Sequence, residues 1–378
     1  MRIGIDMTAL VTEHTGVDVS ITNLVLALSK ADSQNRYFLF VNSADRKTLR
    51  DCLPKNFEVL TVSTRSRLIR LLAQQIVFPI LSYTLRLDVI HSPAFIGPIF
   101  RGRSRRLLTI HDMTFFSIPS HHTTIHRSRL FQQAVFWSID LADKICVPSF
   151  HVRDELTRYS ADVSPDKIRV VNWGIEDAFY PRPTEERNKS LKALGISFPY
   201  IVHVGTVEPR KNLPHLLSSF RFLVKEFGVA EHLVLSGRLG WDYAPVLDAI
   251  ESDDLAGRVH LLGYVEQVHL PALYSGSRLC VYPSLAEGFG FPPLEAMACG
   301  VPVIASDSSS LVELLQGAAE LISSDDERGL ALAMAELLSN DSLRARRIEL
   351  GLLRAAEFTW ERAARRTLEC YSELADSQ

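Results

Sequence analysis

Short apolar runs rich in β-branched residues alternate with longer amphipathic stretches along the whole sequence, and this alternation leaves few possible folds. Seven such runs lie in the first half: IGID, YFLFVN, FEVLTV, DVIH, RLLTIHD, KICVPS and IRVVNWG. Six more follow in the second half: YIVHVGT, HLVLSG, RVHLLGY, LCVYPS, VPVIAS and AELI. Continuous apolar strands separated by helices indicate parallel sheets that are covered on both faces. The predicted class is therefore α/β, with one sheet in each half.

The chain length and one polar segment predict two domains. The 378 residues exceed the common size of a single domain. Residues 180–188 (YPRPTEERN) are polar, contain two prolines and separate the two groups of strand patterns. We therefore expect domains at residues 1–180 and 181–358, each with a doubly wound sheet. The last helical pattern, residues 359–378, can pack against either domain, and we expect it to complete the first.

Composition and charge exclude several classes of protein. With 41 Lys and Arg against 44 Asp and Glu, the net charge is −3, whereas nucleic-acid binders usually carry a basic excess. The five cysteines are scattered without a CxxC pair, which favours buried reduced thiols over disulfides or a zinc site. The N-terminal MRIGIDMTAL enters a strand pattern directly and does not resemble a signal peptide. The expected location is therefore cytoplasmic.

An arginine-rich segment extends from Arg65 to Arg129. It holds ten arginines, no lysine and only two acids, Asp88 and Asp112, so its charge is +8 in a chain of net charge −3. The arginines flank the apolar run Leu68–Leu85, which arginine, glutamine and proline interrupt too often for a transmembrane span. A basic surface beside apolar residues suits an anionic membrane or a phosphorylated acceptor, and arginines on solvated helix faces are the alternative.

The strongest chemical signal is the segment Glu287–Glu295 (EGFGFPPLE), which follows the strand pattern Leu279–Pro283. Its glycines let backbone amides approach a ligand closely, and its two prolines suit the first turn of a helix. The positive end of that helix can bind a phosphate. A carboxylate in the first turn would repel phosphate, so we expect Glu295 to accept hydrogen bonds from sugar hydroxyls instead. A glutamate that only complements the helix dipole is the alternative.

A second cluster, Gly205–Asn212 (GTVEPRKN), also follows an apolar strand pattern. Gly205 permits a tight turn, and Arg210 and Lys211 are adjacent cations at the start of the next helical pattern. Such a pair beside backbone amides would neutralise a diphosphate leaving group. Adjacent basic residues in a loop are often only solvated, but the order of strand, glycine, basic pair and helix favours phosphate binding.

The first half offers fewer signals. His111 and Asp112 end one strand pattern and His91 ends another, so they would lie at the carboxyl edge of the sheet, where ligands of α/β proteins bind. A lone histidine is more often structural, and we expect that role for His91. The loop expected at Thr15–Asp18 is a further place for ligand approach. The sequence has no D-x-D to anchor a metal, and no G-x-G-x-x-G follows the first strand, which argues against a dehydrogenase.

Together these segments resemble the group 1 (family 4) retaining glycosyltransferases of the GT-B fold, over nearly the whole chain. The resemblance is carried by the E-x7-E spacing of Glu287–Glu295, by Gly205–Asn212 and by Ala298–Ser306 (ACGVPVIAS). Lesser matches are LSGRLGW, HLLGYV, TIHD and FTWERAA. The resemblance implies two Rossmann-like, doubly wound domains that face a central cleft, the first binding the acceptor and the second the nucleotide sugar.

The same resemblance implies roles for individual residues. The implied catalytic residues are Glu287, Lys211, Arg210 and His111. The implied donor-binding residues are Gly16, Gly205, Gly237, Tyr264, Val265, Gly288, Phe289, Gly290, Leu294 and Glu295. Lys211 and Arg210 would bind the donor diphosphate, and Glu295 would hold the ribose hydroxyls. Glu287 and the amides that follow it would hold the transferred sugar, which His111 would reach from the first domain.

The sequence departs from the family pattern after Gly16. Members commonly have a second glycine and a basic or aromatic residue there, whereas this chain has Asp18-Val19-Ser20. Asp18 would repel a diphosphate unless its side chain were turned away. This departure is the one motive for considering a non-catalytic subunit of a polysaccharide-assembly complex.

The implied reaction transfers a hexosyl group, glucose from a UDP donor or mannose from a GDP donor, with retention at the anomeric carbon. The acceptor would be a glycan or a lipid-linked molecule in polysaccharide biosynthesis, and the enzyme would be peripheral on the inner face of the membrane. We expect no cofactor, no metal and no nucleic-acid partner. A GT-B-fold nucleotide-sugar epimerase is the other alternative, although the E-x7-E spacing and Gly205–Asn212 argue against it.

Overall fold

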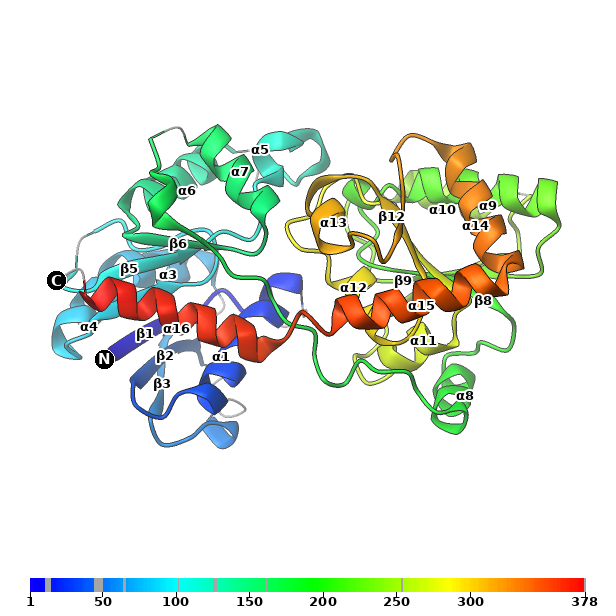
Figure 1. Ribbon diagram of the computed structural model, residues 1–378. Coiled ribbons are helices and arrows are strands. Elements are labelled where there is room, and N and C mark those ends of the chain that lie inside the picture. The colour runs from blue at the N-terminus through cyan, green and yellow to red at the C-terminus, as the bar shows by residue number, and fades with distance from the viewer. Residues whose placement is uncertain are drawn as a thin grey trace. The chain divides into compact units, whose positions relative to one another are not determined.

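The computed structural model in Figure 1 describes residues 1–10, 15–43, 50–63, 66–100, 102–124, 128–160, 162–252 and 254–376. Contacts between residues divide the chain into two compact units. Unit 1 comprises Met1–Pro119, Thr124–Gly174 and Thr359–Gln378, and unit 2 comprises Ser120–Thr123 and Ile175–Phe358. The main chain thus leaves unit 1 at Gly174, shortly before the expected boundary at Tyr180, and the last helix returns to unit 1.

Unit 1 is built on a parallel sheet of seven strands: β1 (Arg2–Asp6), β2 (Arg36–Asn42), β3 (Phe57–Ser63), β4 (Val89–Ser92), β5 (Arg105–Thr109), β6 (Lys144–Val147) and β7 (Ile168–Val170). Their order is β3-β2-β1-β4-β5-β6-β7, so the direction of strand addition reverses between β1 and β4. The main helices are α1 (Gly16–Ala31), α3 (Arg67–Leu72), the π-helical η1 (Ala73–Val77), α4 (Phe78–Thr84), α5 (Thr114–Ser117), α6 (Arg129–Leu141), α7 (Phe150–Tyr159) and α16 (Trp360–Asp376).

Unit 2 repeats this plan with six parallel strands: β8 (Tyr200–Val204), β9 (His232–Ser236), β10 (Val259–Gly263), β11 (Leu279–Tyr282), β12 (Val303–Ser306) and β13 (Glu320–Ile322). Their order is β10-β9-β8-β11-β12-β13, which reverses between β8 and β11. The main helices are α8 (Thr184–Ala193), α9 (Leu213–Phe227), α10 (Ala244–Ile250), α11 (Leu270–Gly276), α12 (Phe291–Ala298), α13 (Ser309–Leu314), α14 (Glu327–Ser339) and α15 (Asp341–Ala355).

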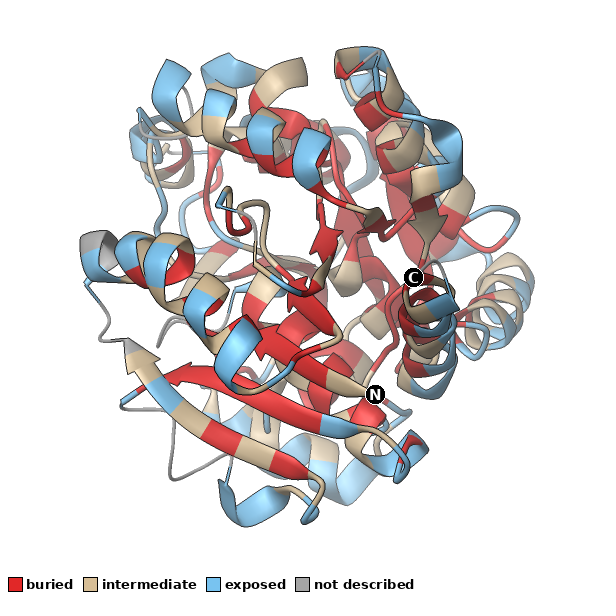
Figure 2. Ribbon diagram, turned by 90° about the vertical axis from the view of Figure 1, so that its left-hand side faces the viewer, coloured by how far each residue is buried: buried red, intermediate tan, exposed pale blue. Residues whose placement is uncertain are grey.

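The strands coincide with the thirteen apolar runs, and the predicted α/β class is confirmed. A parallel strand covered by helices on both faces needs apolar residues at consecutive positions, which is why these runs mark the strands. Figure 2 shows buried strands beside helices whose outer faces are exposed. Helix α9 illustrates the helical part of the pattern, because Leu213, Leu216, Leu217, Phe220 and Leu223 recur at helical spacing and are all buried in the core of unit 2.

The C-terminal helix α16 is an integral part of unit 1, where it packs against α1 and the strands β4, β5 and β6. Its Tyr371 hydroxyl lies 2.8 Å from Nδ1 of His91. Its Glu373 carboxylate forms ion pairs with Lys144 and, at 2.9 Å, with Arg169. The amphipathic pattern of this helix therefore serves the first sheet, although it follows the last strand of the second.

All five cysteines are free thiols. Cys146, Cys280, Cys299 and Cys370 are buried as expected, but Cys52 is exposed. The sulfur atoms of Cys146 and Cys370 lie 3.7 Å apart inside unit 1. No helix in the described ranges is long and apolar enough to cross a bilayer.

Candidate functional site

Two loops of unit 2 meet at the point where its strand order reverses. The loop that contains Gly205–Asn212 follows β8, and the loop that contains Glu287 follows β11, and these two strands are neighbours in the sheet. In open α/β sheets, ligands bind at the carboxyl ends of the strands that flank such a reversal. The two segments with the strongest sequence signals therefore share one location.

The loop after β8 is shaped by a close approach between two glycines. The amide of Gly205 donates to the carbonyl of Ser236 at 2.8 Å, and a Cβ at Gly237 would lie 1.8 Å from the carbonyl oxygen of Gly205. The sequence predicted that Arg210 and Lys211 begin the following helix. Instead, they end a short 3₁₀ turn, Pro209–Lys211, that precedes α9. This turn aims both side chains at the loop after β11.

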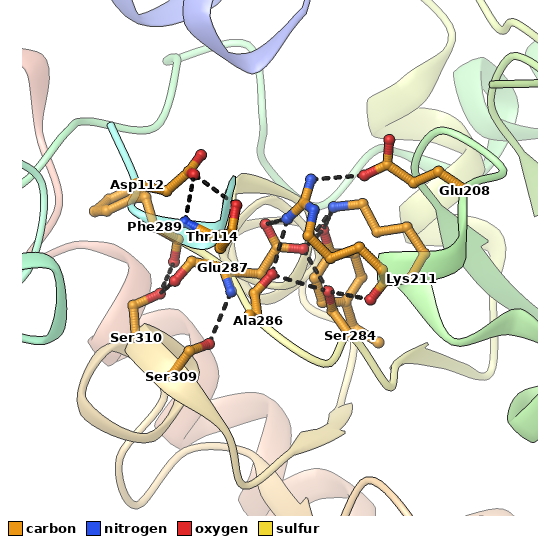
Figure 3. A network of polar contacts seen from close by, with 12 residues as sticks. Asp112, Thr114, Glu208, Lys211, Ser284, Ala286, Glu287, Phe289, Ser309 and Ser310 are labelled. Atoms are coloured by element: carbon orange, nitrogen blue, oxygen red, sulfur yellow. Dashed lines mark hydrogen bonds and ion pairs between the residues drawn. The ribbon is translucent and has the colours of Figure 1, made fainter. Parts of the chain in front are cut away.

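The carboxylate of Glu287 is the centre of this site (Figure 3). Its Oε2 atom accepts a hydrogen bond from the Arg210 guanidinium at 2.7 Å, and its Oε1 atom accepts one from the Lys211 ammonium at 2.5 Å. Oε1 also accepts from the hydroxyls of Ser284 at 2.6 Å and Tyr282 at 3.0 Å. Each cation expected to bind a diphosphate is thus paired with the same buried carboxylate.

The charges of this cluster determine the ionisation of Glu287. Burial alone would raise the pKa of Glu287, but the cationic Arg210 and Lys211 outweigh burial and hold that pKa well below its usual range. Burial lowers the pKa of Lys211, as does the adjacent Arg210, whereas Glu287 acts in the opposite direction. A second carboxylate, Glu208, accepts a hydrogen bond from Arg210 at 2.7 Å. The cluster is therefore ionic and internally compensated.

The backbone around Glu287 is held by the serines at the start of α13. The Glu287 amide donates to the Ser309 hydroxyl at 2.8 Å, and the Ser310 hydroxyl donates to the Glu287 carbonyl at 2.9 Å. Gly290 caps α12 with a φ of 92°, a left-handed conformation that favours glycine. The ring of Phe289 packs edge-on against Phe291 within unit 2, and the role expected for Phe289 in donor binding belongs to its backbone amide.

Glu295 and Leu294 lie in the second turn of α12 rather than in its first turn, since the helix begins at Phe291. Leu294 is fully buried, and its side chain belongs to the core. Burial raises the pKa of Glu295 to about 8, although a 3.0 Å hydrogen bond from the Tyr274 hydroxyl lowers it. Glu295 is therefore mostly a neutral carboxylic acid at pH 7, unlike Glu287.

Tyr264 and Val265, two of the residues implied to bind the donor, follow β10. Tyr264 is exposed, and the guanidinium of Arg238 lies over its ring, 4.5 Å from the centroid. Val265 is buried. The Gly237 amide donates to the Gly263 carbonyl at 2.8 Å, which joins the first residue after β9 to the last residue of β10.

In unit 1 the segment Thr15–Asp18 is not a loop, which corrects the sequence-based expectation. Thr15 caps α1, and Gly16 is the first helical residue. The Asp18 carboxylate accepts hydrogen bonds from the Thr15 amide at 2.8 Å and the Thr15 hydroxyl at 2.7 Å. This is a capping box, which engages the acid with its own helix. The preceding residues 11–14 lie outside the described ranges.

His111 and His91 occupy different environments in unit 1. Nε2 of His111 lies 2.6 Å from the Pro93 carbonyl, which can only accept, so Nε2 carries the proton and Nδ1 of the neutral ring is an acceptor. Burial lowers the pKa of His111, so the neutral form prevails at pH 7. Both nitrogens of His91 are hydrogen-bonded, one to Tyr371 and the other to Thr109 at 2.8 Å. The structural role expected for His91 is confirmed.

Comparison with known proteins places this chain in a family. Residues 185–352 match the family described as glycosyl transferases group 1, and residues 14–179 match glycosyltransferase family 4. The chain is 32% identical to O-antigen chain mannosyltransferase B of Escherichia coli over 287 residues, 76% of this chain and 74% of that protein. The chain belongs to the group 1 glycosyltransferases. It is a glycosyltransferase by this membership, and its Glu287–Glu295 motif lies in the part that matches group 1.

Two further similarities extend this result. The chain is 28% identical to serotype-specific mannosyltransferase WbdA of Escherichia coli over 240 residues, 62% of this chain and 29% of that much longer protein. The crystal structure of Anabaena Alr3699/HepE in complex with UDP and glucose matches with a TM-score of 0.78 at 19% identity, covering 99% of this chain and 100% of that one. The fold of this glycosyltransferase is therefore GT-B.

Several residues of the cluster in this glycosyltransferase were not anticipated from the sequence. Tyr282 and Ser284 hold the Glu287 carboxylate, Glu208 holds Arg210, and Ser309 holds the Glu287 amide. A signal for two of them existed, because Tyr282 and Ser284 are polar residues at the carboxyl end of an otherwise apolar strand. Ser309 is the first residue of α13, and nothing in its local sequence marks it.

Proposed function

We propose that this glycosyltransferase moves a hexosyl group, glucose or mannose, from a nucleotide-diphosphate sugar to a glycan or lipid-linked acceptor in polysaccharide synthesis, with retention at the anomeric carbon. The observation that carries the proposal is the convergence of Arg210, Lys211 and Glu287 at the strand reversal of unit 2. Similarity to two bacterial mannosyltransferases supports mannose, and the fold shared with a protein that holds UDP and glucose supports glucose.

In the proposed chemistry, charged side chains stabilise the charges that develop on the leaving group and on the sugar ring during the reaction. As the bond between the anomeric carbon and the diphosphate breaks, Arg210 and Lys211 stabilise the negative leaving group. In front-side retention, the departing phosphate accepts the proton of the acceptor hydroxyl, which attacks from the same face. Glu287 supplies the negative charge that suits a sugar ring becoming cationic. Because two side chains provide the cationic charge, we propose that the reaction needs no metal and no other cofactor.

A screen of nucleotide sugars tests this proposal. A donor present at 100 times its dissociation constant should stabilise the folded protein by about 2.7 kcal/mol, seen as a shift in thermal unfolding. The donor so found should be consumed faster when a suitable glycan acceptor is added, and NMR of the product should show retained configuration. Conversion of the donor to an isomer without any acceptor would instead establish the epimerase alternative. A folded protein that neither binds nor hydrolyses any donor would establish a non-catalytic subunit.

We also propose that unit 1 docks on an anionic membrane surface through an apolar stripe on the helical segment of residues 67–84. Five large apolar side chains recur at helical spacing on this segment, and between 46% and 61% of each is exposed: Ile69, Leu72, Ile76, Ile80 and Tyr83. A contiguous apolar patch of this kind marks an interaction surface. The stripe lies within the arginine-rich segment.

A neighbouring loop is held against this helical segment. Gln75 donates to the Gly97 carbonyl at 3.2 Å and accepts from the Ile99 amide at 2.7 Å. The Ser82 hydroxyl accepts from the Arg103 amide at 2.9 Å. Phe100, which lies between these anchors, is 65% exposed. An exposed aromatic side chain therefore lies on a loop that is fixed to this helical segment.

Charge favours lipid over a protein partner for this surface. Arg86 and Arg103 are exposed beside the stripe, and each arginine near an anionic surface is worth roughly 1 kcal/mol. The segment charge does not all reach the surface, because Arg106 is buried and Arg105 pairs with Asp143 at 3.0 Å. Arg65, Arg101 and Arg127 lie outside the described ranges. An apolar stripe with flanking cations is the surface expected of an interfacial helix.

A further inference from the structure

The cations of the diphosphate site already have an anion bound to them. Both oxygens of the Glu287 carboxylate are used, one toward Arg210 and one toward Lys211. The side chains of Lys211 and Glu287 are each less than 10% exposed, so this pairing is made largely out of water. An ion pair in such surroundings is far more costly to break than one on the surface, because each partner would be left buried and unpaired.

Neighbouring groups hold the carboxylate in this position. The Ser284 hydroxyl donates to Oε1 at 2.6 Å, and the Tyr282 hydroxyl donates to the same atom at 3.0 Å while it accepts from Lys211 at 2.7 Å. The backbone amide of Glu287 is bonded to Ser309. The carboxylate is therefore positioned by β11, by the loop after it and by α13, and does not merely follow the cations.

A diphosphate that enters this site competes with Glu287 for the same donors. When a sugar is attached to the diphosphate, the sugar hydroxyls can donate new hydrogen bonds to the Glu287 carboxylate. These hydrogen bonds offset the ion pairs that the carboxylate loses. A nucleoside diphosphate without the sugar offers the carboxylate no such partner, and its additional negative charge is repelled by Glu287. Displacement of Glu287 from the cations therefore weakens binding of the product more than binding of the donor.

We propose that Glu287 is a resident counter-ion that competes with the diphosphate for Arg210 and Lys211, so that the enzyme holds the nucleoside diphosphate product weakly relative to the sugar donor. This inference rests on the proposed function, since it gives the cation pair to a diphosphate. Glu287 then has two tasks, because the carboxylate that favours the transferring sugar also favours release of the leaving group.

Calorimetric titration with inorganic pyrophosphate tests the competition directly, because this probe contains neither sugar nor base. Glu287→Gln keeps the shape of the side chain and removes its charge, and it should bind pyrophosphate about tenfold more tightly than wild type. Ser284→Ala keeps every charge but removes one hydrogen bond that holds the carboxylate, so its affinity for pyrophosphate should rise about twofold. Glu336→Gln, an exposed position on α14, is the matched control and should leave affinity unchanged.

The result that overturns the inference is pyrophosphate affinity in Glu287→Gln that equals or falls below the wild-type value. If that variant does not fold, Ser284→Ala decides the matter, and unchanged affinity in Ser284→Ala overturns the inference. The proposed function is judged separately, from sugar transfer by the wild-type protein. Wild-type transfer without tighter pyrophosphate binding in the variants rejects the counter-ion alone, whereas tighter binding without any transfer rejects the proposed function alone.

Discussion

The two units share a strand order, but they differ in what they place at its reversal. In unit 2 the reversal lies between β8 and β11, and two loops bring Arg210, Lys211 and Glu287 within hydrogen-bonding distance. In unit 1 it lies between β1 and β4, where Asp18 is engaged in a capping box and His91 bonds to the C-terminal helix. The shared topology supplies a location, and the side chains decide whether chemistry occurs there.

The units also differ in their outer surfaces. Unit 1 carries the apolar stripe of residues 67–84 with its flanking arginines, whereas large apolar residues of unit 2 such as Leu353 are exposed on helices that carry many charges. In the proposed function, donor chemistry belongs to unit 2 and membrane docking to unit 1.

Lys211→Ala should have the largest effect, because it removes a charge-assisted contact to the developing leaving group. We expect the rate of transfer to fall about a hundredfold, equivalent to about 3 kcal/mol of barrier. Initial rates at saturating donor measure this, with Lys225→Ala on the exposed end of α9 as the control. Turnover of Lys211→Ala within twofold of the wild-type value would contradict a leaving-group role for unit 2.

Glu287→Gln and Glu295→Gln should separate two roles within unit 2. Glu287→Gln should lower the rate at saturating donor by about tenfold, since its charge matters most as the sugar becomes cationic. Glu295→Gln should mainly raise the KM for the donor, because hydrogen bonds to ribose hydroxyls persist throughout the reaction. Steady-state kinetics of both variants provide the test, and identical profiles would argue against distinct roles.

Substitution in the apolar stripe should release unit 1 from membranes without affecting donor chemistry. We expect Ile76→Ser with Ile80→Ser to reduce binding to phosphatidylglycerol vesicles about tenfold. Full burial of an isoleucine side chain contributes roughly 1.5–3 kcal/mol, and docking contributes less because it buries only the exposed part of each side chain. Co-sedimentation measures binding, and Leu353→Ser is the control on α15. Binding of the wild-type protein should also weaken with salt.

Two outcomes would contradict this membrane prediction. Wild-type protein that ignores anionic vesicles at low salt would show that the stripe serves another purpose. Self-association of the wild-type protein, abolished by the same two substitutions, would show that a second copy of the chain covers the stripe.

Donor affinity should increase between pH 7 and pH 9 through Glu295. Burial raises the pKa of this group to about 8, so most of it is protonated at pH 7, whereas the ionised form accepts hydrogen bonds from two hydroxyls best. Because donor affinity scales with the fraction of Glu295 that is ionised, the increase in affinity from pH 7 to pH 9 should approach about tenfold. Calorimetric titrations across this range would show it, and Glu295→Gln should flatten the profile. An equal pH dependence in that variant would place the titration elsewhere.

Removal of divalent metal should have the smallest effect. With Arg210 and Lys211 supplying the cationic charge in unit 2, we expect EDTA to leave initial rates essentially unchanged. Loss of activity that manganese restores would show that the side-chain cations do not suffice.

Much of the fold could be predicted from the sequence, because its signals lie in neighbouring residues. Uninterrupted apolar runs marked the thirteen strands, and the spacing of Leu213, Leu217 and Phe220 marked α9. The two motifs that carry the site could be located for the same reason, since each begins in the loop that follows a strand and strand ends define an edge of the sheet.

Which of these residues meet depends on contacts between distant parts of the chain. Arg210 and Glu287 are separated by 77 positions, and nothing in either segment states that the cation pair meets this carboxylate rather than solvent. The same holds for the helix α16, which returns to the first sheet, and for the outward face of residues 67–84. Local patterns specify which residues are apolar and where strands end, but pairing, burial and pKa depend on neighbours that folding brings from distant parts of the chain.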